Sequence, residues 1–473
     1  MHPCVIGGKL IGTQDSLDVI DPATGGVLAR TARGLSEHVD AAVAAAREAS
    51  PGWRRTPVRE RSAILRRIAD LLRRDREQFA LLESQDTGKP LAQARADADV
   101  AARYFEFYAN TLEAFYGLSY PVDGDIHAFT RREPFGVTGH IIPWNYPLQI
   151  GCRTVAPAIA AGNCAVVKPA EDAPLSVIRL GQLALEAGLP PGVLNIVPGL
   201  GAEAGAALAG HCGIDHLSFT GSVPVGAIVA AAAGANVIPT ALELGGKSPN
   251  IVFGDADLDR AIPVIVKSVI QNAGQTCSAG SRLLVHESVR DQVVEGVGDA
   301  FRALSIGAGP GDPDLGPLIS AKQLGRVRDM VERARPGAVQ VGGPGSIDVP
   351  MEGFFFPPTL LADVDPGAEV AREEVFGPVV AATTFSTLDE AIALANGTNY
   401  ALITAVWTEN LNTAYTMAEE IQAGQIYLNT YGAGGGVEYA FGGFKKSGYG
   451  REKGFEALAA FSQTKTVLLR VYR

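Results

Sequence analysis

The sequence predicts an α/β protein made of two doubly wound domains, and three observations lead to this class. The chain has 473 residues, more than one domain with a single hydrophobic core usually contains, and 47% of these residues are hydrophobic. Between Phe135 and Phe253, short β-branched runs alternate with helical segments, which favours a parallel sheet. A second block with the same alternation extends from about Asp255 to Asn429, so we expect two such sheets.

The first part of the chain divides into short strands and a long helical stretch. Residues 1–36 are rich in turn formers, and a helical pattern extends from Val39 to Tyr116. Apolar residues recur in this stretch at helical spacing, as at Ile64, Leu65, Ile68, Leu71, Leu72, Phe79 and Leu82. The opposite face is rich in arginine, but acidic residues are interleaved with the arginines. We therefore expect a solvent-exposed helix face rather than a nucleic-acid-binding stripe.

Charge and cysteine content argue against several classes of protein. The 40 basic and 51 acidic residues give a net charge of −11, which disfavours binding to nucleic acid or to an acidic membrane. The N-terminal segment lacks the pattern of a signal peptide, and we expect a soluble, cytoplasmic protein. Five cysteines without a CxxC pair argue against a disulfide scaffold and a zinc site, so we expect no metal.

Two glycine-containing turns indicate a nucleotide site. Residues Val197–Gly205 carry a GxGxxxG spacing, which is one residue longer than the dinucleotide fingerprint. Phe219–Ser222 is a second strand-to-helix turn, where free backbone N–H groups can meet phosphate. Ala241–Ser248 resembles a phosphate-binding loop, but alanine replaces its first glycine and Glu243 would repel phosphate, so we reject it. For Val197–Gly205 and Phe219–Ser222, the alternative is that they are ordinary turns that bind no nucleotide.

Cys277 is the candidate nucleophile. It lies among small polar residues and glycines, where a substrate can approach, whereas Cys164 stands in an aliphatic run typical of a buried structural cysteine. A free thiol has a pKa of about 8.5, so the thiolate needs help from backbone dipoles or a base. An inert cysteine in a polar turn is the alternative.

Seven stretches, in order along the chain, resemble the aldehyde dehydrogenase superfamily. They are PWNYPL (Pro143–Leu148), VKPAE (Val167–Glu171), FTGS (Phe219–Ser222), ELGGKSP (Glu243–Pro249), GQTC (Gly274–Cys277), EEVFGP (Glu373–Pro378) and FGGFKKSG (Phe441–Gly448). The resemblance covers nearly the whole chain. It implies a Rossmann-like NAD-binding domain, a catalytic thiol domain and a small β extension for oligomerisation. The implied ranges are residues 1–118 with 135–245, residues 246–440, and residues 119–134 with 460–473, respectively.

The resemblance also implies the reaction and three catalytic residues. The enzyme would oxidise an aldehyde to the carboxylic acid with NAD. Cys277 would add to the carbonyl to give a thiohemiacetal, whose oxyanion Asn145 would stabilise together with the backbone N–H of Cys277. Hydride transfer would leave a thioester, and Glu243 would activate the water that hydrolyses it. Because relatives that transfer the acyl group to coenzyme A commonly lack this glutamate, Glu243 favours water as the acceptor.

Ten residues are expected at the cofactor because they match family positions. They are Ile142, Trp144, Lys168, Glu171, Gly201, Gly205, Phe219, Ser222, Glu374 and Phe376. The Glu171 carboxylate can accept hydrogen bonds from ribose hydroxyls but would repel a 2′-phosphate, so NAD is favoured over NADP.

Three points leave alternatives open. Some relatives carry a second glutamate for proton transfer where this chain has Phe455, so that role is vacant or falls elsewhere. Arg153 could bind a substrate carboxylate, although a structural contact is favoured. Besides the dehydrogenase, a cysteine-dependent hydrolase with a histidine partner and a catalytically silent family member are considered. The expected partners are a small aldehyde and further copies of the chain, in a homodimer or homotetramer.

Overall fold

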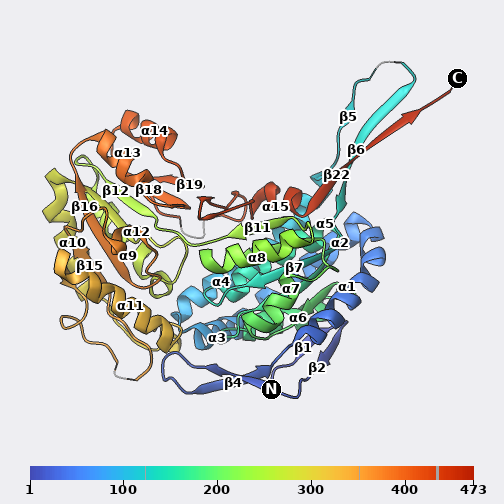
Figure 1. Cartoon of the computed structure of the whole chain (residues 1–473), viewed down its shortest axis with the longest axis horizontal. Helices are drawn as coiled ribbons and strands as arrows, with labels where there is room; N and C mark the ends of the chain where they lie inside the picture. Colours follow the sequence, from blue (N-terminus) through green and yellow to red (C-terminus); the bar gives the residue numbers. More distant parts are fainter. Residues whose placement is uncertain (123, 351, 433–435, 473) are drawn as a thin grey trace.

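A computed structural model gives the fold, in which the described residues form two large mixed sheets and three small antiparallel ones (Figure 1). The mixed sheets confirm the predicted α/β class. Asp123 and Arg473, from the predicted oligomerisation strands, and Met351 and residues 433–435, from the predicted catalytic domain, lie outside the described residues. The structure describes residues 1–122, 124–350, 352–432 and 436–472. The division into domains stays a prediction.

The first large sheet has the strand order β2-β1-β9-β8-β7-β10-β11-β21. The five strands β9, β8, β7, β10 and β11 are parallel to one another. At the two ends of this group, β1 and β21 pair antiparallel with β9 and β11, and β2 pairs antiparallel with β1. The chain order reverses between β7 and β10, and such a switch point is where α/β sheets bind ligands. The bounds are β1 (Cys4–Ile6), β2 (Lys9–Ile11), β7 (Val137–Ile142), β8 (Cys164–Pro169), β9 (Leu194–Ile196), β10 (His216–Thr220), β11 (Thr240–Glu243) and β21 (Gly448–Tyr449).

Helices surround this sheet and share one hydrophobic core with it. Four helices replace the single predicted helical stretch, because Pro57 and Pro90 stand where α2 and α4 begin. The buried face of α2 contains Leu65, Ile68 and Leu72. The bounds are α1 (Ser36–Arg55), α2 (Val58–Arg74), α3 (Arg76–Thr87), α4 (Leu91–Thr111), α5 (Pro147–Ala161), α6 (Leu175–Glu186), α7 (Ala206–Ala209) and α8 (Val223–Ala235).

The second large sheet has the order β14-β15-β16-β13-β12-β18-β19, and only the β14–β15 pair among these described strands is antiparallel. Its strands are β12 (Pro249–Val252), β13 (Arg282–His286), β14 (Val339–Gly342), β15 (Thr359–Ala362), β16 (Val379–Phe385), β18 (Ile403–Trp407) and β19 (Gln425–Leu428). The helices of this part are α9 (Leu258–Ile270), α10 (Arg290–Arg302), α11 (Ala321–Ala334), α12 (Glu369–Arg372), α13 (Leu388–Asn396) and α14 (Leu411–Glu420).

A long arm, formed by a three-stranded sheet, extends away from the rest of the molecule (Figure 1). In it β22 (Ser462–Arg470) pairs antiparallel with β6 (Ile126–Pro134), which also pairs with β5 (Ser119–Tyr120). The remaining elements are β3 (Ser16–Ile20), β4 (Val27–Ala32), β17 (Tyr400–Ala401), β20 (Phe444–Lys445) and α15 (Gly454–Ala460). Among the described residues, no helix combines the length and apolar character that a membrane span needs.

Candidate active site

The predicted site residues of the first sheet gather at its switch point. The turn Pro143–Asn145 follows β7, Ser222 follows β10, and Glu243 is the last residue of β11. These carboxyl ends open on a cavity of about 340 Å³, which Cys277 also lines. The three predicted catalytic residues, Cys277, Glu243 and Asn145, therefore share one cavity.

The loop that carries Cys277 has a strained backbone before the cysteine. Asn272 and Ala273 adopt left-handed conformations, with φ of 49° and 53°, which non-glycine residues rarely do. Hydrogen bonds hold this loop, since Asn272 Nδ2 donates to the Asn145 carbonyl at 2.8 Å. The Gln275 N–H donates to the Asn272 carbonyl at 3.0 Å. Strain that is held in this way is typical of functional loops.

Burial and nearby positive charges have opposite effects on the pKa of Cys277. Burial raises the pKa of the Cys277 thiol to about 12, while the positive charges of Arg153 and Lys453 act in the other direction. Cys277 also lines a second cavity of about 130 Å³, together with those two cations. The backbone N–H of Cys277 donates no hydrogen bond within the described part of the chain, so it can serve an oxyanion.

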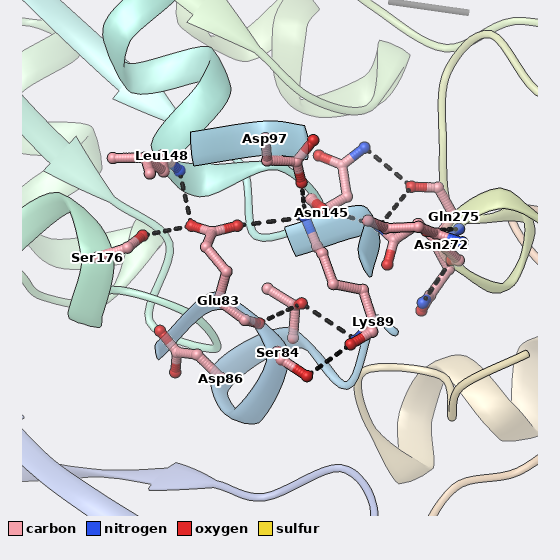
Figure 2. A network of polar contacts seen from close by, with 12 residues as sticks. Glu83, Ser84, Asp86, Lys89, Asp97, Asn145, Leu148, Ser176, Asn272 and Gln275 are labelled. Atoms are coloured by element: carbon pink, nitrogen blue, oxygen red, sulfur yellow. Dashed lines mark hydrogen bonds and ion pairs between the residues drawn. The ribbon is translucent and has the colours of Figure 1, made fainter. Parts of the chain in front are cut away.

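Asn145 lies beside the Cys277 loop (Figure 2). Its Nδ2 donates to the Gln275 carbonyl at 3.0 Å, which fixes the plane of the amide. An amide nitrogen has two hydrogens, so one remains for the oxyanion. Asn145 is 4% exposed, and in such a dry site a donor of this kind is worth more than in water.

A buried charge network fixes the helix that follows Asn145 (Figure 2). Lys89 Nζ lies 2.6 Å from Asp97 Oδ2 and 3.2 Å from Glu83 Oε2. Glu83 Oε1 in turn accepts a hydrogen bond from the Leu148 N–H, at 2.9 Å, in the first turn of α5. Sequence reasoning missed this network, because charged residues on amphipathic helices usually face solvent.

Glu243 is buried without hydrogen bonds to its carboxyl group. Neither of its carboxyl oxygens has a partner among the described residues. Burial raises the pKa of Glu243 well above its usual range, the charge of Glu452 raises it further, and Arg153 acts against both. A carboxyl group in this state can act as a base near neutral pH.

Arg153 and Glu452 form a buried ion pair close to this carboxyl group. Ser218 Oγ also donates to Glu452 Oε1, at 3.1 Å. Arg153 thus contacts a carboxylate of its own chain, where the sequence favoured a structural contact to backbone or to a neighbouring subunit. At the position of the second glutamate, Phe455 is 47% exposed and its ring packs edge-on at 6.3 Å from Phe107. Sequence reasoning missed the buried carboxylate of Glu452, because its polar Gly-Arg-Glu-Lys-Gly surroundings predict an exposed side chain.

Four of the ten predicted cofactor residues line the larger cavity, namely Trp144, Ser222, Glu374 and Phe376. The rings of Trp144 and Phe376 meet edge to face at 5.3 Å. Glu374 accepts a hydrogen bond from the Gly246 N–H at 2.9 Å, and burial raises its pKa to about 7. The volume and the mix of aromatic and polar lining suit a nicotinamide nucleotide.

Four others form a group at the ends of β8 and β9. Lys168 Nζ pairs with Glu171 Oε2 at 2.7 Å, and Glu171 Oε1 accepts from the Gly201 N–H at 3.2 Å. Gly205 lies against the Lys168 side chain. Ile142 and Phe219, the last two, are buried in β7 and β10.

The histidines of the hydrolase alternative do not reach the cysteine. Among the described residues, neither cavity next to Cys277 is lined by a histidine. Burial lowers the pKa of His140 to about 3, and its ring stacks on Phe461. His286 hydrogen-bonds Ser288 at 2.7 Å. The structure therefore favours the dehydrogenase arrangement over a cysteine–histidine pair.

Comparison with known proteins assigns the family. The model of the aldehyde dehydrogenase family matches residues 11–467. The chain belongs to the aldehyde dehydrogenase family. This confirms the resemblance inferred from the seven motifs.

Individual aldehyde dehydrogenases match over nearly the whole chain. Retinal dehydrogenase 2 of Homo sapiens is 43% identical over 462 residues, covering 96% of this chain and 88% of its own. The crystal structure of an NAD-dependent aldehyde dehydrogenase from Sinorhizobium meliloti is 39% identical, with a TM-score of 0.97, covering 100% of this chain and 95% of its own. An NAD⁺ complex of the aldehyde dehydrogenase from Bacillus cereus is 37% identical, with a TM-score of 0.97, covering 99% and 96%.

Proposed function

We propose that this NAD-dependent aldehyde dehydrogenase releases a free carboxylic acid through a covalent intermediate on Cys277. One observation carries the proposal: Cys277, Asn145 and Glu243 line a single cavity next to the predicted nicotinamide residues. A nucleophile, an oxyanion donor and a base are the three groups that acyl transfer to water requires.

The first step is the addition of the Cys277 sulfur to the aldehyde carbonyl. The charges of Arg153 and Lys453 favour the thiolate against the effect of burial. The oxyanion that forms accepts hydrogen bonds from Asn145 Nδ2 and from the backbone N–H of Cys277. Because these donors are held in place before the reaction, each contributes about 10²–10³ in rate.

The second step is oxidation, and the third is hydrolysis. NAD supplies the hydride acceptor when it is bound, and Trp144, Glu374 and Phe376 line the place for its nicotinamide end. The thioester left on Cys277 is then attacked by a water that Glu243 deprotonates. The raised pKa of Glu243 makes its carboxylate a stronger base than an ordinary glutamate.

The preference for NAD is assigned to Glu171. Its carboxylate pairs with Lys168 through Oε2 and accepts from the Gly201 N–H through Oε1, and the remaining lone pairs of these oxygens can accept hydrogen bonds from the ribose hydroxyls. A 2′-phosphate at this position would meet a negative charge.

We also propose a homodimer or homotetramer built on the β22–β6–β5 arm. The arm exposes apolar side chains, at Leu118, Tyr120, Val122, Leu468, Leu469, Val471 and Tyr472. An exposed apolar patch of this kind is typical of a subunit contact. All five cysteines are free, and a free catalytic thiol suits the reducing cytoplasm that we infer as its compartment.

The names of the relatives refer to different aldehydes, including retinal and hydroxyisobutyraldehyde. The substrate class of this chain therefore depends on its own pocket.

The test combines an aldehyde screen with three variants. Aliphatic, aromatic and acidic aldehydes are supplied with NAD or NADP, and formation of the reduced cofactor is recorded. Cys277→Ala should abolish reduction, whereas Cys212→Ala, at an exposed cysteine, should retain it. Glu243→Gln should keep a burst of about one hydride per site and then turn over at least about 10²-fold more slowly, since only hydrolysis needs this base.

Two results would contradict the proposal. One is full activity in Cys277→Ala, because the reaction would then need no thiol. The other is unchanged steady-state turnover in Glu243→Gln, which would require a different base for hydrolysis.

A further inference from the structure

A third cavity lies in the part of the molecule that is built on the second sheet. Its volume is about 150 Å³. The described lining comes from β13 and β16, from α12 and α13, and from the loops next to these two helices. None of these residues lines either cavity at Cys277. A molecule in the third cavity is therefore outside the site of the proposed reaction.

A buried arginine, Arg282, stands in the wall of this cavity. It is 5% exposed, and all three of its nitrogens donate to backbone carbonyls. Nε donates to Lys247 at 2.9 Å, Nη1 to Leu394 at 2.8 Å and Nη2 to Ala395 at 2.9 Å. A guanidinium has five N–H groups, so two remain for a ligand.

The charge of Arg282 has no carboxylate partner in the described part of the chain. The described lining of the cavity holds neither aspartate nor glutamate, and burial alone lowers the pKa of Arg282 to about 10. The carbonyls of Leu394 and Ala395 belong to the last turn of α13. The C-terminal end of a helix is equivalent to about half a negative charge, so about half of the guanidinium charge stays uncompensated.

Two further cations stand near Arg282. Lys247 Nζ is buried without a hydrogen-bond partner among the described residues. Burial, and then the charge of Arg282, lowers the pKa of Lys247 to about 7, while Glu374 and Glu373 act in the other direction. Arg372, the exposed last residue of α12, lines the cavity itself. The potential in the cavity thus favours an anion.

The polar groups of the wall select a carboxylate over a phosphate. Thr383 donates its hydroxyl hydrogen to the Val364 carbonyl at 2.9 Å, and Thr398 donates to the Tyr400 carbonyl at 3.1 Å. These hydroxyls therefore have no hydrogen left for a ligand, and the arginines supply the donors. Two N–H groups of one guanidinium match the two oxygens of a carboxylate, whereas a phosphate has more oxygens to satisfy.

The size and the apolar part of the wall limit the rest of the ligand. Leu284, Pro366, Ala371 and Leu394 line the cavity beside the arginines. A volume of about 150 Å³ corresponds to about five water molecules. Such a space suits an alkyl chain of a few carbons.

We propose that this cavity is a second ligand site, which binds a short aliphatic carboxylate. The carboxylate accepts hydrogen bonds from Arg282, Arg372 adds charge at the exposed side, and the alkyl chain lies against the apolar wall. The inference goes beyond the proposed function and does not depend on it, because the ligand binds without turnover.

Calorimetric titration of the full chain provides the first test. We would compare butanoate with butanamide, which has the same size without the charge, at pH 8 and constant ionic strength. Butanoate is ionised at this pH. Its dissociation constant should be at least about tenfold lower than that of butanamide, as expected for hydrogen bonds to a charged group.

A variant at the rim of the cavity shows where butanoate binds. Ala393 is an exposed lining residue of α13, and an indole in its place would fill the cavity. Ala393→Trp should weaken butanoate binding at least about tenfold, since the chain and the carboxylate lose their place. Its NAD reduction with an aliphatic aldehyde should stay unchanged, because Ala393 lines neither cavity at Cys277. Ala44→Trp, at an exposed alanine of α1, is the matched control and should bind butanoate normally.

A second variant tests the charge without filling the cavity. Arg372→Gln removes an exposed cation and should weaken butanoate binding about two- to fivefold, as expected for a solvent-exposed charge. Arg55→Gln, at an exposed arginine of α1, should leave the dissociation constant unchanged.

Three results would overturn the site. The first is butanamide binding as tightly as butanoate, because the cavity would then not recognise charge. The second is unchanged butanoate binding in Ala393→Trp and in Arg372→Gln, which would place the anion elsewhere, for example at Cys277. The third is absence of saturable butanoate binding below about 10 mM. None of them affects the proposed dehydrogenase function, which the variants of Cys277 and Glu243 test separately.

Discussion

The buried carboxyl group of Glu243, the proposed base, costs the fold stability. A carboxyl group that is buried without hydrogen bonds loses its interactions with water and gains none from the protein. Its raised pKa follows from this state, first through burial and then through the charge of Glu452. The same desolvation that destabilises the carboxylate makes it a better base, so we expect stability and activity to oppose each other here.

The stability lost by burying the Glu243 carboxylate can be measured from the pH dependence of the free energy of unfolding. An acid with a raised pKa in the folded state binds its proton more tightly there than in the unfolded chain. Unfolding then releases a proton between the two pKa values, so stability falls as the pH rises through that window. Glu243→Gln should therefore raise the free energy of unfolding by about 1 kcal/mol or more at pH 8, and by much less at pH 4.

Urea unfolding of both proteins at the two pH values is the measurement. Glu295→Gln, at an exposed glutamate of α10, serves as the control and should change stability little at either pH. A Glu243→Gln protein that is less stable than the wild type at pH 8 would contradict this account.

Sequence reasoning at the residue scale found groups that stand in recognisable motifs. Cys277, Glu243 and Asn145 were named in this way, and the structure brings them to one cavity. Glu452 and Lys453 were missed as site residues, because their burial depends on strands that are distant in sequence. Three charged residues, Arg451, Glu452 and Lys453, stand directly before Gly454, and such a run usually predicts exposed side chains.

At the scale of elements, the start of α5 depends on charges from two other helices. Glu83 and Lys89 belong to α3 and the turn after it, and Asp97 belongs to α4. The Lys89 ammonium also lies 4.2 Å from the centroid of the Tyr146 ring, next to Asn145. Their contacts connect three helices to Asn145, the proposed oxyanion donor (Figure 2).

Removing the central cation should therefore destabilise this region. Lys89→Met leaves Glu83 and Asp97 buried without their partner, which should lower the free energy of unfolding by about 3–5 kcal/mol. Lys267→Met, at an exposed lysine of α9, is the matched control and should have little effect. Chemical unfolding at neutral pH measures both. A loss below about 1 kcal/mol in Lys89→Met would mean that the carboxylates find other partners or become neutral.

At the scale of the whole molecule, the arm was only partly predictable. The family resemblance implied oligomerisation strands in residues 119–134 and 460–473, and in the structure β22 pairs with β6 of the same chain. Leu468 and Leu469 are both exposed, although successive residues of a strand point to opposite faces. Both faces of the arm thus present apolar groups, which supports the proposed contact with another copy.

Charge on the arm should separate the copies. The double variant Leu468→Glu, Leu469→Glu should shift the protein to monomers, because buried like charges would repel across a symmetric interface. Sedimentation velocity measures the mass in solution. Lys465→Gln, in the same strand, is the control and should retain the oligomer. A wild-type protein that is already monomeric would contradict the proposal.

The large sheets were predictable because their pattern is local, and the closing strand was not. Alternation of apolar runs and helices is visible in the sequence, and it gave the α/β class correctly. In contrast, β21 has only two residues, and its Gly448 pairs with Glu243, far away in the sequence. A pairing between residues this far apart is not visible in any short stretch of sequence, because so short a strand forms only against its partner.

The segment that brings the chain back to the first sheet lines one of the two cavities at Cys277 and not the other. The segment from Phe441 to Gly454 supplies Phe441 and Lys453 to the wall of the smaller cavity, and supplies nothing to the described lining of the cofactor cavity. Substitution of Phe441 or Lys453 therefore alters the wall of the smaller cavity and leaves the described residues that line the cofactor cavity unchanged. A library of variants in this short segment would therefore vary the wall of the smaller cavity while every described residue that lines the cofactor cavity is kept.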